Sequence, residues 1–451
     1  MRKLIIVGLA QTLFLLAGCG GGSGSLTGGG GGSGGGGSGS SGPPANTVAI
    51  TVDNGPDPQA GYDADTPFIT VTVCAPGSTS NCQTIDHVEL DTGSYGLRIM
   101  SSVLTSSLAS ALQSEQGSGG NGIVECTEFV DGFSWGPVKL ADVQIAGESA
   151  SSVPMQVIGD PSYESEIPTG CSSTGTEEDS VAAFGANGII GIGPFAQDCG
   201  SNCVLSNSQY AADPLYYTCP SGGTSTSDCQ ATGPATDQQV TDPVADFQTD
   251  NNGVIVEIQS ATEGATTDTG TLIFGIGTES NNALGAQTVL TADPNYGDIS
   301  TTYTTQDDHQ MILPYSYIDT GSNAYYFADG GIPSDTNCSS QPGYSSSNPQ
   351  TWFCPASELT LSATNSGQNG LQSTVDFSIG NAYTLFNSYP TGTVFDDLGA
   401  SSGPEPGDCS ATTQDLSCVF DFGFPFFLGR DVYIAFAGAS TTGGTGPYFA
   451  Y

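Results

Sequence analysis

The tetrapeptide Asp-Thr-Gly-Ser occurs twice in this chain of 451 residues, at positions 91–94 and 319–322. Each copy follows a short apolar run and precedes another, and a second apolar run closed by glycine comes later in each half, at 188–193 and 426–429. A motif that is repeated together with its surroundings indicates an internal duplication. The repeat therefore predicts two similar halves, each presenting one aspartate on a tight loop.

Most apolar residues fall in runs of strand length between turn-forming residues, which predicts an all-β fold with one helix, over 101–113. We expect an N-terminal lobe over 47–250 and a C-terminal lobe over 251–451. Within the first, the polar stretch 197–242 is predicted to be a long surface insertion. The clearest predicted strands cover 48–52, 68–73, 88–90, 138–145, 153–158, 254–258, 271–274 and 432–436.

A third Asp-Thr-Gly, at 268–270, stands in a different context. Polar Thr266 and Thr267 precede it, and a predicted strand follows. Aspartate and glycine in such a position are typical of a tight turn. We interpret 268–270 as a hairpin turn without a chemical role.

Two carboxyl groups that share one proton can hydrolyse an amide bond, because one activates water and the other protonates the carbonyl oxygen. The paired motifs in their contexts resemble the pepsin-like aspartic proteases and, more closely, bacterial lipoproteins related to them. The resemblance covers most of 47–436. It implies a bilobal fold of two pseudo-symmetric β lobes with an active-site cleft between them, and a catalytic dyad of Asp91 and Asp319.

The same resemblance gives supporting roles to the rest of each motif. The threonines can hydrogen-bond across the two loops, the glycines let the backbone turn behind the carboxylates, and the serine hydroxyls can hold carboxylate oxygens. The runs 188–193 and 426–429 fit the segments that thread these loops in the family, and 246–275 fits its interlobe strands. The supporting residues are Thr92, Gly93, Ser94, Thr320, Gly321 and Ser322.

The segment that corresponds to the family's flap, 125–136, departs from the family pattern. Active members place a tyrosine on this hairpin over the cleft, and the segment contains none. Asp131-Gly132 predicts its tight turn. Phe129, Phe133 and Trp135 are candidates for covering the cleft, and among them only Trp135 offers a hydrogen-bond donor. The alternative is that these aromatic residues belong to the core or to strand pairs.

The first 19 residues are typical of a bacterial lipoprotein signal peptide, with Arg2 and Lys3, an apolar run over 4–16, and Leu-Ala-Gly-Cys ending at Cys19. This resemblance implies cleavage before Cys19 and a lipid on its sulfur. Gly20 implies an outer-membrane location, facing the periplasm or the cell surface. Residues 20–46 are rich in glycine and serine, which predicts a flexible tether.

Cys19 aside, twelve of the 13 cysteines remain, and an even number in an exported chain predicts a disulfide framework. We expect pairing between sequence neighbours, although twelve thiols allow many connectivities. With two histidines, His87 and His309, and no paired Cys-x-x-Cys motif, neither a metal site nor a cofactor is predicted, and His87 is interpreted as a surface or hydrogen-bonded residue. The expected disulfides are Cys74–Cys82, Cys126–Cys171, Cys199–Cys203, Cys219–Cys229, Cys338–Cys354 and Cys409–Cys418.

The charge balance of the chain is strongly acidic. Five Lys and Arg face 46 Asp and Glu, a formal net charge of -41, which disfavours nucleic acid and anionic membrane surfaces as partners. We expect a monomer whose contact with the membrane is made through the lipid on Cys19 alone. The scarcity of cations indicates either acid tolerance or a solubility device.

These features predict two alternative functions. The first is an outer-membrane-tethered aspartic endopeptidase that cleaves a peptide or protein substrate in the interlobe cleft. The second is a catalytically weak or inactive pepsin-like binding module that holds a peptide or glycan in the cleft. The missing flap tyrosine and the lack of a basic, helix-forming prosegment between Cys19 and Ala45 favour the second. A glycosidase also needs two carboxylates, but does not explain the shared Thr-Gly-Ser frame.

Overall fold

The computed structural model describes residues 44–57, 64–117, 119–130, 132–204, 214–346, 351–406, 409 and 418–451. The predicted signal peptide (1–19) with Cys19, most of the tether and Asp131 lie outside these residues. Strands account for 41% of the structure and helices for 11%, so the all-β prediction is confirmed. In the described ranges, no helix is both long enough and apolar enough to cross a bilayer.

The N-terminal half supplies twelve strands and four short helices to the described structure. Strand β4 is buried along its whole length because sheet neighbours and loops cover both of its faces. The strands are β1 (Thr47–Val52), β2 (Pro67–Cys74), β3 (Cys82–Asp91), β4 (Tyr95–Met100), β5 (Gln113–Ser114), β6 (Gly122–Glu128), β7 (Gly132–Ile145), β8 (Glu148–Ile158), β9 (Thr176–Glu177), β10 (Gly188–Ile192), β11 (Tyr216–Cys219) and β12 (Gln230–Ala231). The helices are α1 (Ser106–Ala109), α2 (Thr169–Ser172), α3 (Val181–Phe184) and α4 (Ser201–Val204).

The C-terminal half contributes the remaining strands and the helix α5 (Ala382–Ser388). Strand β20 alternates cleanly, with Val375, Phe377 and Ile379 on its buried face. The strands are β13 (Gly253–Ile258), β14 (Asp268–Phe274), β15 (Val289–Thr291), β16 (Ile299–Thr304), β17 (Gln310–Ile318), β18 (Tyr325–Phe327), β19 (Leu359–Ser366), β20 (Gln372–Ile379), β21 (Gly399–Ser401), β22 (Asp421–Phe422), β23 (Asp431–Ala435), β24 (Ser440–Thr441), β25 (Gly444–Thr445) and β26 (Tyr448–Ala450).

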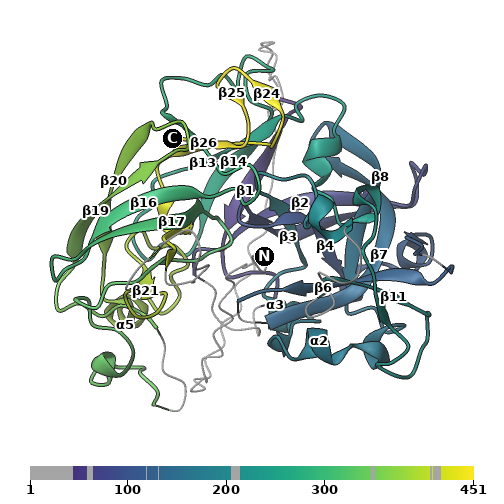
Figure 1. Cartoon of the computed structure of the whole chain (residues 1–451), viewed down its shortest axis with the longest axis horizontal. Helices are drawn as coiled ribbons and strands as arrows, with labels where there is room; N and C mark the ends of the chain where they lie inside the picture. The colour runs from purple at the N-terminus through teal and green to yellow at the C-terminus, as the bar shows by residue number, and fades with distance from the viewer. Residues whose placement is uncertain are drawn as a thin grey trace, which may run out of the picture.

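A 17-stranded sheet and one hydrophobic cluster include residues of both halves, whereas β16 to β22 form a separate 7-stranded sheet. Figure 1 shows β3, β4, β7 and β8 on one side and β16, β17, β19 and β20 on the other, with β1, β13 and β14 between them, which agrees with the predicted two-lobed arrangement. Strand β1 pairs antiparallel with β14 over its full length, so hydrogen bonds cross the expected lobe boundary at 250. One hydrophobic cluster contains Leu90 and Ile190 as well as Ile318 and Phe422.

Each Asp-Thr-Gly-Ser loop is threaded by a short strand. In the N-terminal lobe, β10 runs parallel to β3 and antiparallel to β4, so that Gly191 pairs with Asp91. In the C-terminal lobe, β22 runs parallel to β17 and antiparallel to β18. The expectation that 426–429 threads the second loop was therefore wrong. The threading residues are Asp421, Phe422 and Gly423, where a Cβ on Gly423 would lie 2.0 Å from the Ala324 carbonyl oxygen.

Three local predictions also need correction. The predicted helix over 101–113 is a 3-10 turn, Ser101–Val103, followed by the short α1, because extended Leu104 interrupts it and Thr105 caps a new helix by accepting the Leu108 N–H. The residues 268–270 are not a hairpin turn but the start of β14, where all three pair with β1 and Gly270 also pairs with β13.

The stretch 197–242 is more than a surface insertion. Strand β11 pairs with β6, and Tyr216 and Val240 are fully buried. The Tyr216 hydroxyl donates to Asp198 at 2.7 Å and accepts the Val240 N–H at 2.8 Å, which ties the stretch to the lobe. The structure contains six disulfides, all between cysteines adjacent in the sequence order: Cys74–Cys82, Cys126–Cys171, Cys199–Cys203, Cys219–Cys229, Cys338–Cys354 and Cys409–Cys418.

Candidate active site

The two motif aspartates lie face to face, each against the glycine of the other loop. A Cβ built on Gly93 would lie 2.5 Å from Cγ of Asp319, and one built on Gly321 would lie 2.7 Å from Cγ of Asp91. Any larger residue at either position would therefore collide with the opposite carboxyl group. The glycines are what allows two carboxyl groups from residues 228 positions apart to approach each other.

The motif threonines lock the two loops together beneath the carboxyl groups. The Thr92 hydroxyl donates to the Ile318 carbonyl at 3.0 Å and accepts the Thr320 N–H at 3.0 Å. The Thr320 hydroxyl repeats this in reverse, donating to the Leu90 carbonyl at 2.6 Å and accepting the Thr92 N–H at 3.1 Å. All four residues that make these bonds are buried, so the bonds fix the distance between the loops.

Asp91 accepts hydrogen bonds from three donors in its own loop. Its Oδ1 accepts the Gly93 N–H at 2.7 Å and the Ser94 N–H at 3.2 Å, and its Oδ2 accepts the Ser94 hydroxyl. Donors directed at a carboxylate favour its ionised form. The loop around Asp91 is therefore arranged to hold a negative charge.

Asp319 has a similar loop but shares its serine with a third carboxyl group. Its Oδ1 accepts the Gly321 N–H at 2.8 Å, and its Oδ2 lies 2.9 Å from the Ser322 hydroxyl. The same hydroxyl lies 2.6 Å from Oδ2 of Asp421, the first residue of the threading strand β22. One hydroxyl hydrogen can be donated to only one acceptor. At least one of Asp319 and Asp421 must therefore carry a proton.

Burial and charge agree with this proton count. Asp319 is fully buried, and burial together with the carboxylates of Asp91 and Asp421 raises its pKa well above the ordinary value. The pKa of Asp421 is also raised well above its ordinary value, mainly by burial and in part by Asp91, while hydrogen bonds from Ser322 and Tyr317 oppose the shift. The site thus keeps protons at a pH where an exposed carboxyl group has lost its own.

The candidate flap aromatics pack inside the N-terminal lobe. The Trp135 indole N–H donates to the Tyr163 carbonyl at 3.1 Å, and its ring packs edge-on against Tyr217. Phe129 packs against Phe184, and Phe133 lies in the same buried cluster as Trp135. These side chains are buried in the core, which was the second of the two alternatives that the sequence left open.

The hairpin that carries these aromatics is paired along both of its outer edges. Strand β6 pairs with β11 of the 197–242 stretch, and β7 pairs at its start with β9. The Cys126–Cys171 disulfide adds a covalent link from β6 to α2. A flap that closes over substrate needs a free hairpin. Here the corresponding hairpin is an interior part of a sheet.

A buried ion pair connects the first motif to this hairpin. Arg98, four residues after Ser94, is fully buried and bonds Glu125 of β6 at 2.7 Å and the Tyr95 carbonyl at 2.8 Å. Asp198 lies 3.5 Å from the same guanidinium, and burial and the nearby Glu125 raise the pKa of Asp198 well above its ordinary value. With Asp198 protonated, one cation meets one anion, as a buried site requires.

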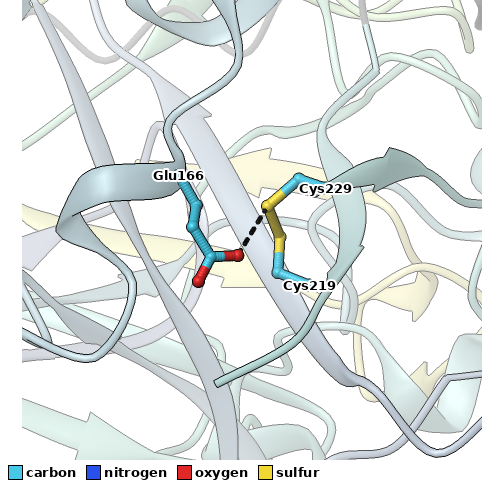
Figure 2. A group of neighbouring side chains, drawn as sticks. All are labelled: Glu166, Cys219 and Cys229. Carbon is cyan, nitrogen blue, oxygen red and sulfur yellow. Dashed lines mark hydrogen bonds between the residues drawn. A yellow bond between two sulfur atoms is a disulfide. The ribbon is translucent and has the colours of Figure 1, made fainter. Parts of the chain in front are cut away.

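Among the residues that the structure describes, two groups of side chains have the spacing of metal ligands. Figure 2 shows one of them, in which Glu166 lies beside the Cys219–Cys229 disulfide with its carboxyl 3.4 Å from the Cys229 sulfur. Disulfide sulfurs are not thiolates and do not ligate metals as Cys residues do. Burial raises the pKa of Glu166, which favours a protonated carboxyl that donates to the sulfur. The second group consists of the three acids Glu263, Asp396 and Asp397.

Both histidines of the chain lie beside acidic side chains. His87 lies 3.3 Å from Asp53, and His309 lies 3.1 Å from Glu405, so both have carboxylate partners outside the dyad. Sequence reasoning missed Asp421 and Arg98. Asp421 occupies a position where an apolar residue was expected, and the usable signal was the glycine two residues later. For Arg98, the usable signal was that a single cation stands within an apolar run.

Comparison with known proteins gives one family and one similar structure. Residues 42–451 match the family described as "Protein of unknown function (DUF3443)". No curated protein matches the chain. Among solved structures, the chain is similar to the "Crystal structure of aspartic proteinase from Irpex lacteus", with a TM-score of 0.47 and 14% identity, over 90% of this chain and 96% of that chain.

Proposed function

Since the chain belongs to the family described as "Protein of unknown function (DUF3443)", we propose its activity from its own residues: an aspartic endopeptidase with a dyad of Asp91 and Asp319. The observation that carries the proposal is the approach of these two carboxyl groups in loops locked by Thr92 and Thr320. Two carboxyl groups that share a proton can supply the base and the acid of amide hydrolysis.

In the proposed mechanism, Asp91 is the base and Asp319 is the acid. The three donors around Asp91 favour its carboxylate, and the raised pKa of Asp319 keeps a proton on the other side. Asp91 takes a proton from the attacking water while Asp319 donates one to the carbonyl oxygen, which forms a tetrahedral diol. Asp91 then returns its proton to the amide nitrogen while the Asp319 carboxylate takes one back from a diol hydroxyl, which breaks the C–N bond, releases two peptides and restores the dyad.

Substrate access is a separate requirement of the proposal. Asp91 and Asp319 are both 0% exposed, and the paired β6–β7 hairpin does not offer the movement of a free flap. Catalysis therefore needs another covering segment to move away from the carboxyl groups. Slow turnover on folded proteins and faster turnover on short peptides are expected.

The proposed location is the outer membrane, through a lipid on Cys19. The support is the signal-like sequence over 1–19, together with six disulfides, which form in oxidising compartments. Radiolabelled palmitate incorporated by the wild-type chain and not by a Cys19→Ala chain, both expressed in bacteria, tests the lipid. Equal labelling of the two chains would contradict it.

The activity is tested with purified Asp91→Asn and Asp319→Asn chains on a peptide library at acid pH. We expect each change to reduce cleavage at least about 1,000-fold, and the double change to be no worse, because the two groups act as a unit. Pepstatin should block the wild-type activity. Asp268→Asn is the matched control, because it changes the third Asp-Thr-Gly, which lies in β14 and not in the site.

Two outcomes would contradict the endopeptidase. Undiminished cleavage by Asp91→Asn would show that the products come from another enzyme. Equal losses in Asp268→Asn would show that the loss reflects folding, and circular dichroism of all variants separates these cases.

The binding module stays as a second candidate because a specific observation favours it. The hairpin β6–β7 is paired on both edges and its Trp135 N–H is already used, so it lacks the mobile donor of an active flap. This candidate predicts peptide retention over a broad pH range with no new termini by mass spectrometry. Binding that survives Asp91→Asn without product formation would favour it over the endopeptidase.

A further inference from the structure

Three acidic side chains converge in the C-terminal half, apart from the dyad residues. One carboxylate oxygen from each of Glu263, Asp396 and Asp397 lies within 4.8 Å of the other two. Asp397 is buried, Glu263 is half-buried and Asp396 is exposed. The cluster thus has a buried floor and a side open to solvent.

The backbone around the cluster is fixed by hydrogen bonds between distant segments. The Gly264 N–H donates to the Val394 carbonyl at 2.8 Å, and the Val394 N–H donates to the Ala265 carbonyl at 3.1 Å. Oδ1 of Asp65, from the N-terminal half, accepts the Phe395 N–H at 2.8 Å. The turn that carries Glu263 and the segment that carries Asp396 and Asp397 are therefore held side by side before any ligand binds.

Two buried acids of this region each have one oxygen without a donor among the described residues. Asp397 is 4% exposed, and its Oδ1 has no hydrogen-bond partner among the described residues. The neighbouring Asp65 is 0% exposed, and its Oδ2 is likewise without a partner in that part of the chain. The charged groups that act most strongly on Asp397 are Glu263, Asp396 and Glu358, all acids. Buried carboxylate oxygens without a donor or cation are costly, so a cation bound beside them would stabilise this cluster.

We propose that Glu263, Asp396 and Asp397 bind a hard divalent cation, calcium, with water completing the coordination on the open side. Calcium takes oxygen ligands at about 2.3–2.6 Å, so oxygens around one ion lie within about 5 Å of each other, as these do. The donor set contains no nitrogen or sulfur, which disfavours zinc. The ion ties the turn at Glu263 to the segment 396–397 and supplies the charge that the buried oxygens lack.

The test uses calcium and terbium on the full chain in 0.15 M KCl, where weak binding to the acidic surface is screened. Tyr389 hydrogen-bonds Glu263, so terbium in the site should show tyrosine-sensitised emission that calcium displaces at one ion per chain. Relative to EDTA, 1 mM calcium should raise the Tm of the wild type by about 2 °C or more. Magnesium should give a smaller rise, because it requires near-octahedral ligands.

Asp397→Asn should weaken calcium binding by about tenfold or more and abolish the Tm rise. Without calcium this variant should be at least as stable as the wild type, because it removes an uncompensated buried acid, so a folding defect is not the expected cause. Asp376→Asn, an exposed acid on β20, is the control of equal charge change and should bind like the wild type. No saturable binding by the wild type, or unchanged binding by Asp397→Asn, would overturn the proposal.

Discussion

The two Asp-Thr-Gly-Ser loops share backbone geometry and threonine bonds, yet they differ in what lies behind each carboxyl group. In the N-terminal lobe the threading strand places Ile189 opposite Glu89, two residues before Asp91. In the C-terminal lobe the equivalent position, opposite Tyr317, is occupied by Asp421. An apolar residue in one loop is thus replaced by a buried acid in the other.

Because of this difference, only the second motif loop has another carboxyl group beside its serine. Ser94 donates to Asp91 alone, whereas Ser322 lies between the carboxyl groups of Asp319 and Asp421. The duplication supplies a symmetric frame that brings the carboxyl groups together. The acid at 421 then makes the second loop the one that retains protons, which fits the assignment of the acid and base roles.

The strongest expected effect concerns the symmetric part of the comparison, the threonine bonds. Thr92→Val leaves the Ile318 carbonyl and the Thr320 N–H unpaired, and Thr320→Val leaves the equivalent pair, Leu90 carbonyl and Thr92 N–H, unpaired. Each change should lower the free energy of unfolding by about 2–4 kcal/mol, because two buried polar groups lose their partner. Urea denaturation measures this.

The control for both threonine variants is Thr360→Val on the exposed face of β19, which should change stability by less than about 0.5 kcal/mol. The two threonine variants should lose similar free energies of unfolding. If the difference between the two losses is larger than the smaller loss, the two loops are not held symmetrically.

The serines should break the symmetry. Ser94→Ala removes the hydroxyl donor of one carboxyl group, and we expect a loss of about 1–2 kcal/mol. Ser322→Ala removes the hydroxyl that lies between two carboxyl groups, Asp319 and Asp421, and should cost roughly 1 kcal/mol more at neutral pH. Denaturation of both variants under one condition gives the difference, and equal losses would argue against a shared role for Ser322.

Replacing the third acid should change the pH dependence of stability. The folded-state pKa of Asp421 is raised, so the folded chain keeps a proton that the unfolded chain loses above about pH 4. Its stabilising effect is present below that pH and is lost as pH rises toward the folded-state pKa. In this window the wild type should lose about 1.4 kcal/mol per pH unit relative to Asp421→Asn.

Denaturation of both chains from pH 4 to pH 7 checks this prediction. The groups around Asp421, namely Ser322, Tyr317, Asp319 and Asp91, remain in both chains and provide a common background. Parallel stability curves would mean that Asp421 does not hold the proton assigned to it.

The sequence predicted the elements that depend on local pattern and repetition. Both aspartates, their glycines and the strands before them were found because a duplicated motif preserves its context. Asp421 was missed because the threading segment was sought as an uninterrupted apolar run, and 426–429 matched that pattern better. What identifies the true segment is its pairing with β17 and the close approach of Gly423 to Ala324, and both are tertiary facts.

The role of the flap region also depends on tertiary pairing that the sequence does not show. The sequence shows a hairpin with three aromatics, but whether they cover a cleft depends on what pairs with its outer edges. The partner β11 comes from the 197–242 stretch, which lacked periodicity and was predicted to lie on the surface. Buried Tyr216, bonded to Asp198 and Val240, turns that stretch into part of the lobe.

The smallest expected effect belongs to the third Asp-Thr-Gly, which tests whether the tripeptide or its context matters. Asp268 begins β14 opposite Val52 and takes part in no bond between the motif loops. Asp268→Asn should therefore change the free energy of unfolding by no more than about 0.5 kcal/mol, because it keeps the shape of a half-buried side chain at a strand end. Urea denaturation beside Thr92→Val supplies the scale. A loss comparable to that of Thr92→Val would mean that β14 contributes to the site through contacts beyond its pairing with β1 and β13.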